Sequence, residues 1–217
     1  MLLNYLAKGG SQVAARGSFF NRKLHSLLGV IPVGVFLLQH LFVNHFILYG
    51  PESFNRAAEF MGNLPLRIFL EVFFIYLPLL YHGIYGLYIA FQAKYNVLNY
   101  GYFRNVMFLL QRVTGMILII FIAWHVWETR IAAAFGAEVN TQMMVDILSS
   151  PVMLVIYIIG VVSAAFHFAN GMWSFCVTWG ITIGPKAQRI STYFWMVIFV
   201  ILAVGGCLIL FEFATLA

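Results

Sequence analysis

The chain has 217 residues, of which 63% are hydrophobic and 9% charged, whereas soluble domains carry about 25% charged residues. So few polar groups cannot cover a water-facing globule, so the composition excludes a soluble domain and predicts a protein built for lipid. The net charge of +5 is modest and lies mostly between the apolar segments, which argues against a nucleic-acid-binding protein. Two cysteines in apolar runs are too few for an iron–sulfur site in this chain.

The chain is expected to fold as a single domain over residues 1–217. Residues 1–23 hold four basic side chains and no apolar run, which predicts a polar leader on the inner side of the membrane. Five apolar segments follow, each long enough to cross a bilayer as a helix. They are expected at residues 24–49, 66–92, 104–130, 151–179 and 191–213. The predicted fold class is therefore all-α integral membrane, with five transmembrane helices in an up-down bundle.

The charges between these segments predict the orientation of the bundle. Lysine and arginine gather on one side, in the leader and at Lys94, Arg104, Lys186 and Arg189. The opposite connections and the tail carry mainly acidic residues: Glu52, Glu59, Glu138, Asp146 and Glu212. Since short basic segments stay on the inner side, the N-terminus is expected inside and the C-terminus outside.

Four of the six histidines lie inside expected spans, one in each of the first four: His40, His82, His125 and His167. An ionisable side chain in hydrocarbon is costly and normally faces the bundle interior for a reason. His82 and His167 each follow the outer start of their helix by about 16 residues, roughly 24 Å. His40 and His125 precede the outer ends of theirs by about 5 to 9 residues, roughly 8–14 Å. The four histidines therefore form two pairs at two depths.

Both pairs are placed to hold haem. In an up-down bundle the first and third helices stand diagonally opposite, as do the second and fourth, and the diagonal is about 13 Å. That gap suits a flat macrocycle with an imidazole on each side, so we predict an outer b haem between His40 and His125 and an inner one between His82 and His167. Any one histidine alone is better explained as a hydrogen-bonded interior residue, but the match of depths favours haem. Neither cysteine nor carboxylate stands beside them in those helices to build another metal site.

The other polar candidates are weaker. Arg112 lies near the depth of the inner haem, where an arginine is expensive and haem propionates are suitable partners, although it could also extend to the inner headgroups. His25 lies at the inner end of the first helix, near either an inner propionate or a soluble partner. At the outer side, His45, Glu59 and Glu71 are ionisable side chains that could move protons, although a simply solvated Glu59 is the plainer interpretation.

Five runs of sequence resemble a known family. They are RKLHSLLGVIPVG (22–34), YHGIYGLYIA (81–90), FLLQRVTG (108–115), AWHVWETRIAA (123–133) and FHFANGMWSF (166–175). They are similar to the cytochrome b membrane anchors of succinate dehydrogenase, of the single-subunit, five-helix, di-haem type found in Bacillus-like bacteria. The fumarate reductases of epsilon-proteobacteria share the pattern more distantly.

The resemblance implies a role in respiratory electron transfer. In that family His40, His82, His125 and His167 would be the axial ligands of two haem b groups. The partners would be a flavoprotein subunit and an iron–sulfur subunit on the cytoplasmic face of the plasma membrane, with menaquinone as the electron acceptor. His45, Glu59 and Glu71 would then be candidates for the quinone pocket at the outer side. Electrons would pass from the iron–sulfur subunit through the inner and outer haems to menaquinone, and succinate chemistry would belong to a partner subunit.

Three alternatives stay open at this point. One is a fumarate reductase anchor, which is the same chemistry reversed. Another is a different di-haem cytochrome b, such as the anchor of a formate dehydrogenase or hydrogenase, although those usually distribute their ligands differently. The third is a haem-free transporter or structural anchor, whose reduced-minus-oxidised spectrum would lack b-type bands.

Overall fold

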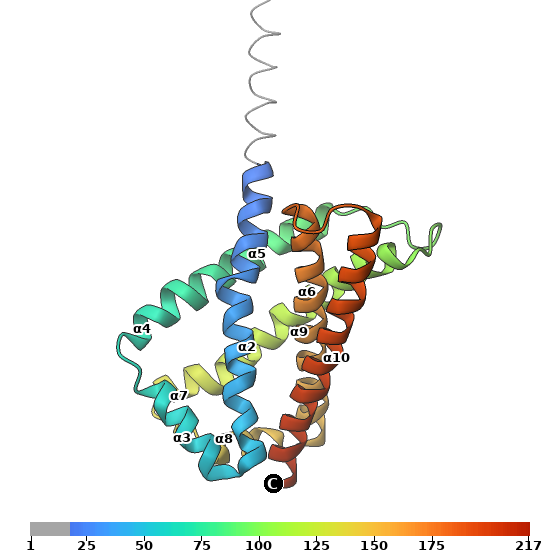
Figure 1. Cartoon of the computed structure of the whole chain (residues 1–217). Helices are drawn as coiled ribbons and strands as arrows, with labels where there is room; N and C mark the ends of the chain where they lie inside the picture. Colours follow the sequence, from blue (N-terminus) through green and yellow to red (C-terminus); the bar gives the residue numbers. More distant parts are fainter. Residues whose placement is uncertain (1–17) are drawn as a thin grey trace, which may run out of the picture.

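The computed structural model describes residues 18–217, and in that range the regular elements are all helical (Figure 1). Five helices are long and apolar enough to cross a membrane: Ser18–Tyr49, Arg67–Gln92, Phe103–Ala134, Pro151–Thr178 and Pro185–Thr215. They confirm the five expected spans, with boundaries shifted by a few residues. The first begins at Ser18, so the last part of the expected leader is helical, while residues 1–17 lie outside the described range.

The first span continues from helical residues 18–30 into two named elements. These are α2 (Pro32–His45) and the 3₁₀ segment η1 (Phe46–Tyr49). The span ends at Gly50, whose φ of 100° suits glycine, and Pro51 then begins the next helix. The fifth span starts in the same way, with Gly184 at φ 84° before Pro185.

The second and third spans each contain a π-helical segment near one end. The second consists of α4 (Arg67–Leu70), the π-helical η2 (Glu71–Tyr76) and α5 (Leu77–Gln92). The third consists of α6 (Phe103–Val126), the π-helical η3 (Trp127–Ile131) and α7 (Ala132–Ala134). π-helical turns often mark functional sites, because i→i+5 bonding changes which residues share a face.

The spans pack in a ring in which neighbours in the chain are neighbours in space. α2 packs against α5, α5 against α6, and α6 against α9 (Pro151–Thr178); α10 (Pro185–Thr215) packs against both α9 and α2. In Figure 1, α2, α9 and α10 stand nearly upright, while α5 and α6 run obliquely across the view. This order leaves α2 facing α6, and α5 facing α9, across the bundle.

Two short helices that the sequence analysis treated as loops cover the end of the bundle that holds the C-terminus (Figure 1). They are α3 (Pro51–Gly62) and α8 (Thr141–Leu148), and Asn140 caps α8 by accepting a hydrogen bond from the Met143 amide at 3.1 Å. Asn55 of α3 accepts hydrogen bonds from the Thr141 amide and hydroxyl at 2.7 and 2.8 Å. Beneath them lies a buried cluster of Ile47, Phe54, Leu148, Tyr157, Ile209, Leu210 and Phe213.

The opposite end is held together by basic side chains. Lys23 donates to the Thr178 carbonyl and lies over the Trp179 ring. Arg104 donates to Thr192 and lies 3.6 Å from the centre of the Trp173 ring. These contacts join the first span to the fourth, and the third to the fourth and fifth, at the end where the sequence predicts the inner face.

Candidate functional site

The structure brings His82 and His167 together across the bundle. Their rings, from α5 and α9, have centres 6.1 Å apart and planes at 84°. His82 Nδ1 lies 2.9 Å from the backbone carbonyl of His25, and His167 Nδ1 lies 3.1 Å from that of Gln111. A neutral imidazole that donates from Nδ1 leaves Nε2 free to bind a metal.

His40 and His125 form the second pair, nearer the end covered by α3 and α8. Their rings, from α2 and α6, have centres 5.8 Å apart and planes at 73°. His125 Nδ1 lies 3.3 Å from the hydroxyl of Tyr157. His40 differs from the other three, because the side-chain polar contact of its ring is made by Nε2, which lies 3.5 Å from the Asn44 amide nitrogen, the outer limit for a hydrogen bond.

The spacing within both pairs fits one metal ion between two imidazoles. Metal–imidazole bonds are about 2 Å long, so two imidazoles on opposite sides of a metal have ring centres about 6 Å apart. Within residues 18–217 no three histidine, cysteine, aspartate or glutamate side chains gather to form a metal site of their own. A metal that brings its own equatorial ligands, as haem iron does, needs only such a pair.

His25 packs directly on His82. The two rings are stacked, with centres 4.0 Å apart and planes at 8°. Gly29 permits this arrangement, because a Cβ at that position would lie 2.5 Å from His82 Nδ1. A Cβ at Gly86 would come 3.2 Å from His25 Cε1, whereas Gly83 faces open space. Of these glycines, Gly29 makes the closest approach to a paired histidine.

Among the buried side-chain atoms without a hydrogen-bond partner within residues 18–217 are His25 Nδ1, on the ring that stacks on His82, and Arg112 Nε, next to Gln111 in α6. Arg112 donates to the Phe108 carbonyl at 2.7 Å, and its guanidinium lies 3.3 Å from the centre of the Phe108 ring. Unpaired buried donors are rare because they are costly. These two atoms therefore fit a group with acceptor oxygens, such as a haem carboxylate, near His82 and His167.

Side chains of α6 and α9 lock His167 in place. Gln111 donates to the His167 carbonyl at 3.0 Å and accepts a hydrogen bond from Asn170, which is 5% exposed, at 2.7 Å. Thr114 Oγ1 lies 3.3 Å from His167 Nδ1. A Cβ at Gly115 would lie 3.1 Å from His167 Cε1, so α6 also approaches this ring closely. The ring orientation is thus set by four residues of one helix pair.

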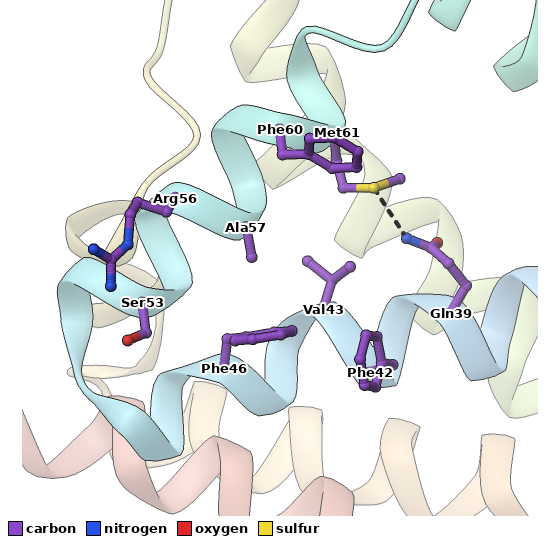
Figure 2. A pocket seen from close by; sticks show the side chains of 9 residues that line it. All are labelled: Gln39, Phe42, Val43, Phe46, Ser53, Arg56, Ala57, Phe60 and Met61. Carbon is purple, nitrogen blue, oxygen red and sulfur yellow. Dashed lines mark hydrogen bonds between the residues drawn. The ribbon is translucent and has the colours of Figure 1, made fainter.

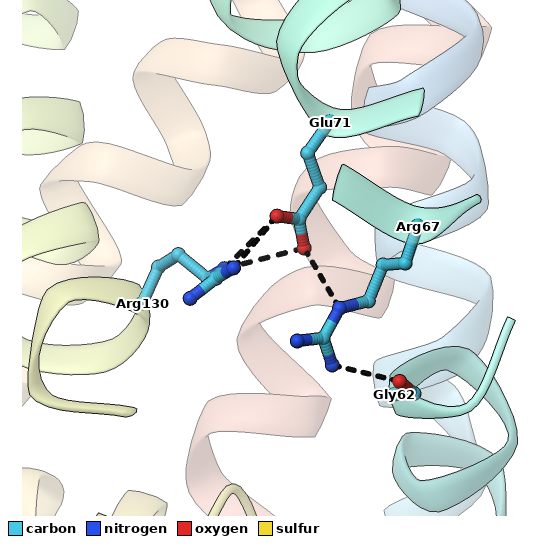
Figure 3. Close-up of polar contacts among 4 residues, drawn as sticks. All are labelled: Gly62, Arg67, Glu71 and Arg130. Carbon is cyan, nitrogen blue, oxygen red and sulfur yellow. Dashed lines mark hydrogen bonds and ion pairs between the residues drawn. The ribbon is translucent and has the colours of Figure 1, made fainter. Parts of the chain in front are cut away.

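Glu71 lies in an ion pair rather than alone (Figure 3). Arg130 donates to its carboxylate from Nε at 3.2 Å and from Nη2 at 2.8 Å, and Arg67 Nε lies 3.6 Å away. Arg67 also donates to the Gly62 carbonyl at 2.7 Å. The residue before Arg67, Leu66, has a left-handed φ of 57°. Both π-helical segments thus contribute to one contact, since Glu71 begins η2 and Arg130 lies in η3.

The three residues expected at a quinone pocket have separate surroundings. His45 packs its ring 5.6 Å from that of Tyr49, Glu59 is exposed on α3, and Glu71 is in the ion pair described above. A cavity of about 520 Å³ lies close by, between the end of α2 and α3 (Figure 2). It is lined by Gln39, Phe42, Val43, Phe46, Ser53, Arg56, Ala57, Phe60 and Met61. Gln39 donates there to the Met61 sulfur at 3.4 Å.

The sequence analysis did not single out several residues of the site. They are Gly29, Gln111, Glu128, Arg130, Tyr157 and Asn170. Glu128 could have been found from the sequence, because it follows His125 by three residues and residues three apart lie on the same face of a helix. The partners of the others depend on how each helix is rotated, which a helix that is apolar on all sides does not reveal.

Comparisons with known proteins agree with this architecture. The model of the succinate dehydrogenase/fumarate reductase transmembrane subunit family matches residues 98–206. The succinate dehydrogenase cytochrome b558 subunit of Bacillus subtilis (strain 168) is 62% identical over 195 residues, covering 90% of this chain and 96% of that protein. These matches confirm the resemblance drawn from the five sequence runs. The chain therefore belongs to the family of succinate dehydrogenase and fumarate reductase transmembrane subunits.

Proposed function

We propose that this chain is the di-haem b membrane anchor of a succinate:quinone oxidoreductase, carrying electrons between an iron–sulfur subunit and menaquinone. The observation that carries the proposal is the pairing of four transmembrane histidines at ring-centre distances of 5.8 and 6.1 Å. The similar Bacillus subtilis protein is itself named a cytochrome b558 subunit. Haem held by two histidines supplies one-electron transfer with no open iron position.

Each residue of the site has a definite task in this proposal. His40 and His125 would hold the outer haem, and His82 and His167 would hold the inner one. The His25 and Gln111 carbonyls keep the protons of the inner imidazoles on Nδ1, at 2.9 and 3.1 Å. Arg112 and the His25 ring provide donors for haem carboxylates at the inner side.

The partner subunits would bind at the inner, basic end. Lys23 and Arg104 lie there, and lysine and arginine favour the cytoplasmic side of a bacterial plasma membrane. The flavoprotein and iron–sulfur subunits would therefore be cytoplasmic, with the C-terminus of this chain outside. Electrons that leave at the outer end have moved to the more positive side of the membrane. The membrane potential therefore favours this transfer by about 2.3 kcal/mol per charge at 100 mV.

The cavity beside α3 is the place we assign to the quinone head group. Its volume of about 520 Å³ lies within the usual range of about 300–1,000 Å³ for small-molecule sites. Gln39 precedes His40 in the chain, so this side of the cavity lies at nearly the same depth as the outer pair. The thioether of Met61 is a weak acceptor, and the Gln39 amide can exchange it for a quinone carbonyl. His45, Glu59 and Glu71 do not line the cavity, and they remain candidates for moving protons toward it.

Purification of the complex from its native membrane tests the main proposal. We expect a flavoprotein and an iron–sulfur protein to accompany the chain, and the reduced-minus-oxidised spectrum to show b-type bands with two redox transitions. A purified complex that lacks b-type absorption would rule out the haem assignment. One that carries haem but other partner subunits would identify a different cytochrome b anchor.

Changing Gln39 tests the quinone assignment. Gln39→Leu removes one donor, which is worth about 0.5–1.5 kcal/mol, so the KM for menaquinone should rise about 2- to 10-fold. Ala57→Phe should raise it further by filling the cavity. Gln142→Leu is the matched control and should leave the KM unchanged, because Gln142 is exposed on α8 and donates to Asp146 at 2.7 Å. Normal KM values in both cavity variants, with normal haem spectra, would place the quinone elsewhere.

A further inference from the structure

The imidazole hydrogen bonds of the inner and outer pairs differ in chemistry. In the inner pair, both Nδ1 atoms face neutral backbone carbonyls, those of His25 and Gln111. In the outer pair, His125 Nδ1 faces the hydroxyl of Tyr157 at 3.3 Å. That hydroxyl in turn lies 3.1 Å from Glu128 Oε2. His125 is thus the one paired histidine for which the described residues provide a hydrogen-bonded path to a carboxylate.

The direction of each hydrogen bond in this path follows from the number of protons available. An ionised carboxylate only accepts, so the single hydroxyl proton of Tyr157 goes to Glu128. The Tyr157 oxygen then accepts from His125 Nδ1, which fixes the proton of the imidazole on that nitrogen. Nε2 is left without a proton, as a metal ligand requires.

Tyr157 is held where it can do this. It is 2% exposed and belongs to the buried cluster under α3 and α8. Phe121 packs on it edge to face, with ring centres 5.3 Å apart, and also stacks on His125 at 5.8 Å. Glu128 lies in η3, and the neighbouring Thr129 donates to the His125 carbonyl at 2.6 Å. The Tyr157 ring and the His125 ring are therefore held by packing, and Glu128 is positioned by its bond to the Tyr157 hydroxyl.

We propose that Tyr157 and Glu128 are positioning residues for His125 that lower the midpoint potential of the outer haem. This inference rests on the proposed function. The negative carboxylate makes the Tyr157 oxygen a better acceptor, which makes the imidazole a stronger electron donor. A stronger donor favours the oxidised iron, and hydrogen bonding to an axial ligand is one of the ways in which a protein sets haem potential. The inner pair, bonded to neutral carbonyls, lacks this contribution.

Two substitutions separate the hydrogen-bonded path from the charge alone. Tyr157→Phe breaks the path but keeps the ring and the carboxylate, whereas Glu128→Gln keeps an acceptor but removes the charge. In potentiometric titrations of the purified complex, both should raise the potential of the outer haem, with the larger shift in Tyr157→Phe. The inner transition should not move, and the low-spin electron paramagnetic resonance signal of only one haem should change. Tyr193→Phe, at a tyrosine on α10 that is 68% exposed, is the matched control and should shift neither transition.

The outcomes distinguish this inference from the haem assignment. A wild-type complex without b-type absorption defeats the proposed function before any variant is made. Two haems whose potentials are unchanged in both variants defeat only the inference. A shift in Glu128→Gln without one in Tyr157→Phe would show that the charge acts through space, which also overturns the hydrogen-bonded path. If Tyr157→Phe does not assemble, an unchanged outer potential in Glu128→Gln, at the partly exposed end of the path, is sufficient to reject it.

Discussion

The variants His82→Ala and His40→Ala are each expected to lose one b haem, and not the same one. His82 lies opposite His167 and His40 opposite His125, so each substitution removes one axial ligand from a different pair. About half of the b-type absorbance should remain in each variant. Potentiometric titration should show a single transition in each, at the potential of the haem that is left.

His45→Ala is the matched control for this experiment. His45 lies on the same helix as His40, but its ring packs against Tyr49 and belongs to neither pair. The control should keep both transitions. Loss of the same transition in His40→Ala and His82→Ala would contradict the pairing, since it would place both histidines on one iron.

Adding a single methyl group at Gly29 should displace the inner haem. The Cβ of Gly29→Ala would overlap the His82 ring, 2.5 Å from Nδ1. The ring cannot move aside easily, because it is stacked on His25 and bonded to the His25 carbonyl. Overpacking of this kind costs about 1–3 kcal/mol, and here the strain falls directly on a metal ligand. We expect loss of the inner transition or a changed spectrum for that haem alone.

Gly83→Ala separates this effect from a general loss of helix packing. Gly83 is next to His82 in the chain, yet a Cβ there would meet nothing within 4 Å. Both haems should be retained in this variant, and its thermal stability should stay close to that of the parent. Retention of the inner haem with an unchanged spectrum in Gly29→Ala would mean that α5 lies farther from the first helix than the structure places it.

The arrangement of the spans and the grouping of the histidines were accessible from the sequence for a simple reason. Hydrophobic length defines a transmembrane helix, and the rise per residue converts position into depth. His40 and His167 could therefore be assigned to different levels without knowing how any helix was rotated. The short helices α3 and α8 were missed because their segments, of 12 and 8 residues, are too short to form a span.

The contacts around the histidines were harder to predict, because they depend on helix rotation. Lipid and protein interior are both apolar, so a transmembrane helix shows little periodicity that would reveal its inward face. The pair of Glu71 and Arg130 illustrates a second obstacle. On a regular α-helix, two residues five positions apart point in directions that differ by roughly 140°. In a π-helical turn they point toward nearly the same face, so a π-helical segment changes which side chains face the neighbouring helix. The sequence alone does not reveal the two π-helical segments, so it could not predict that Arg130 forms an ion pair with Glu71.

The buried cluster under α3 and α8 also bears on how the protein is assembled in the cell. Its members, among them Ile47, Phe54 and Phe213, contact one another and involve only residues of this chain. That end can consequently fold during insertion, before any prosthetic group arrives. The inner half has fewer buried apolar side chains and unpaired donors on His25 and Arg112, so its ordering depends more on what binds there. Assembly of the chain would then start at the end covered by α3 and α8, and the opposite end, around His82 and His167, would become ordered later.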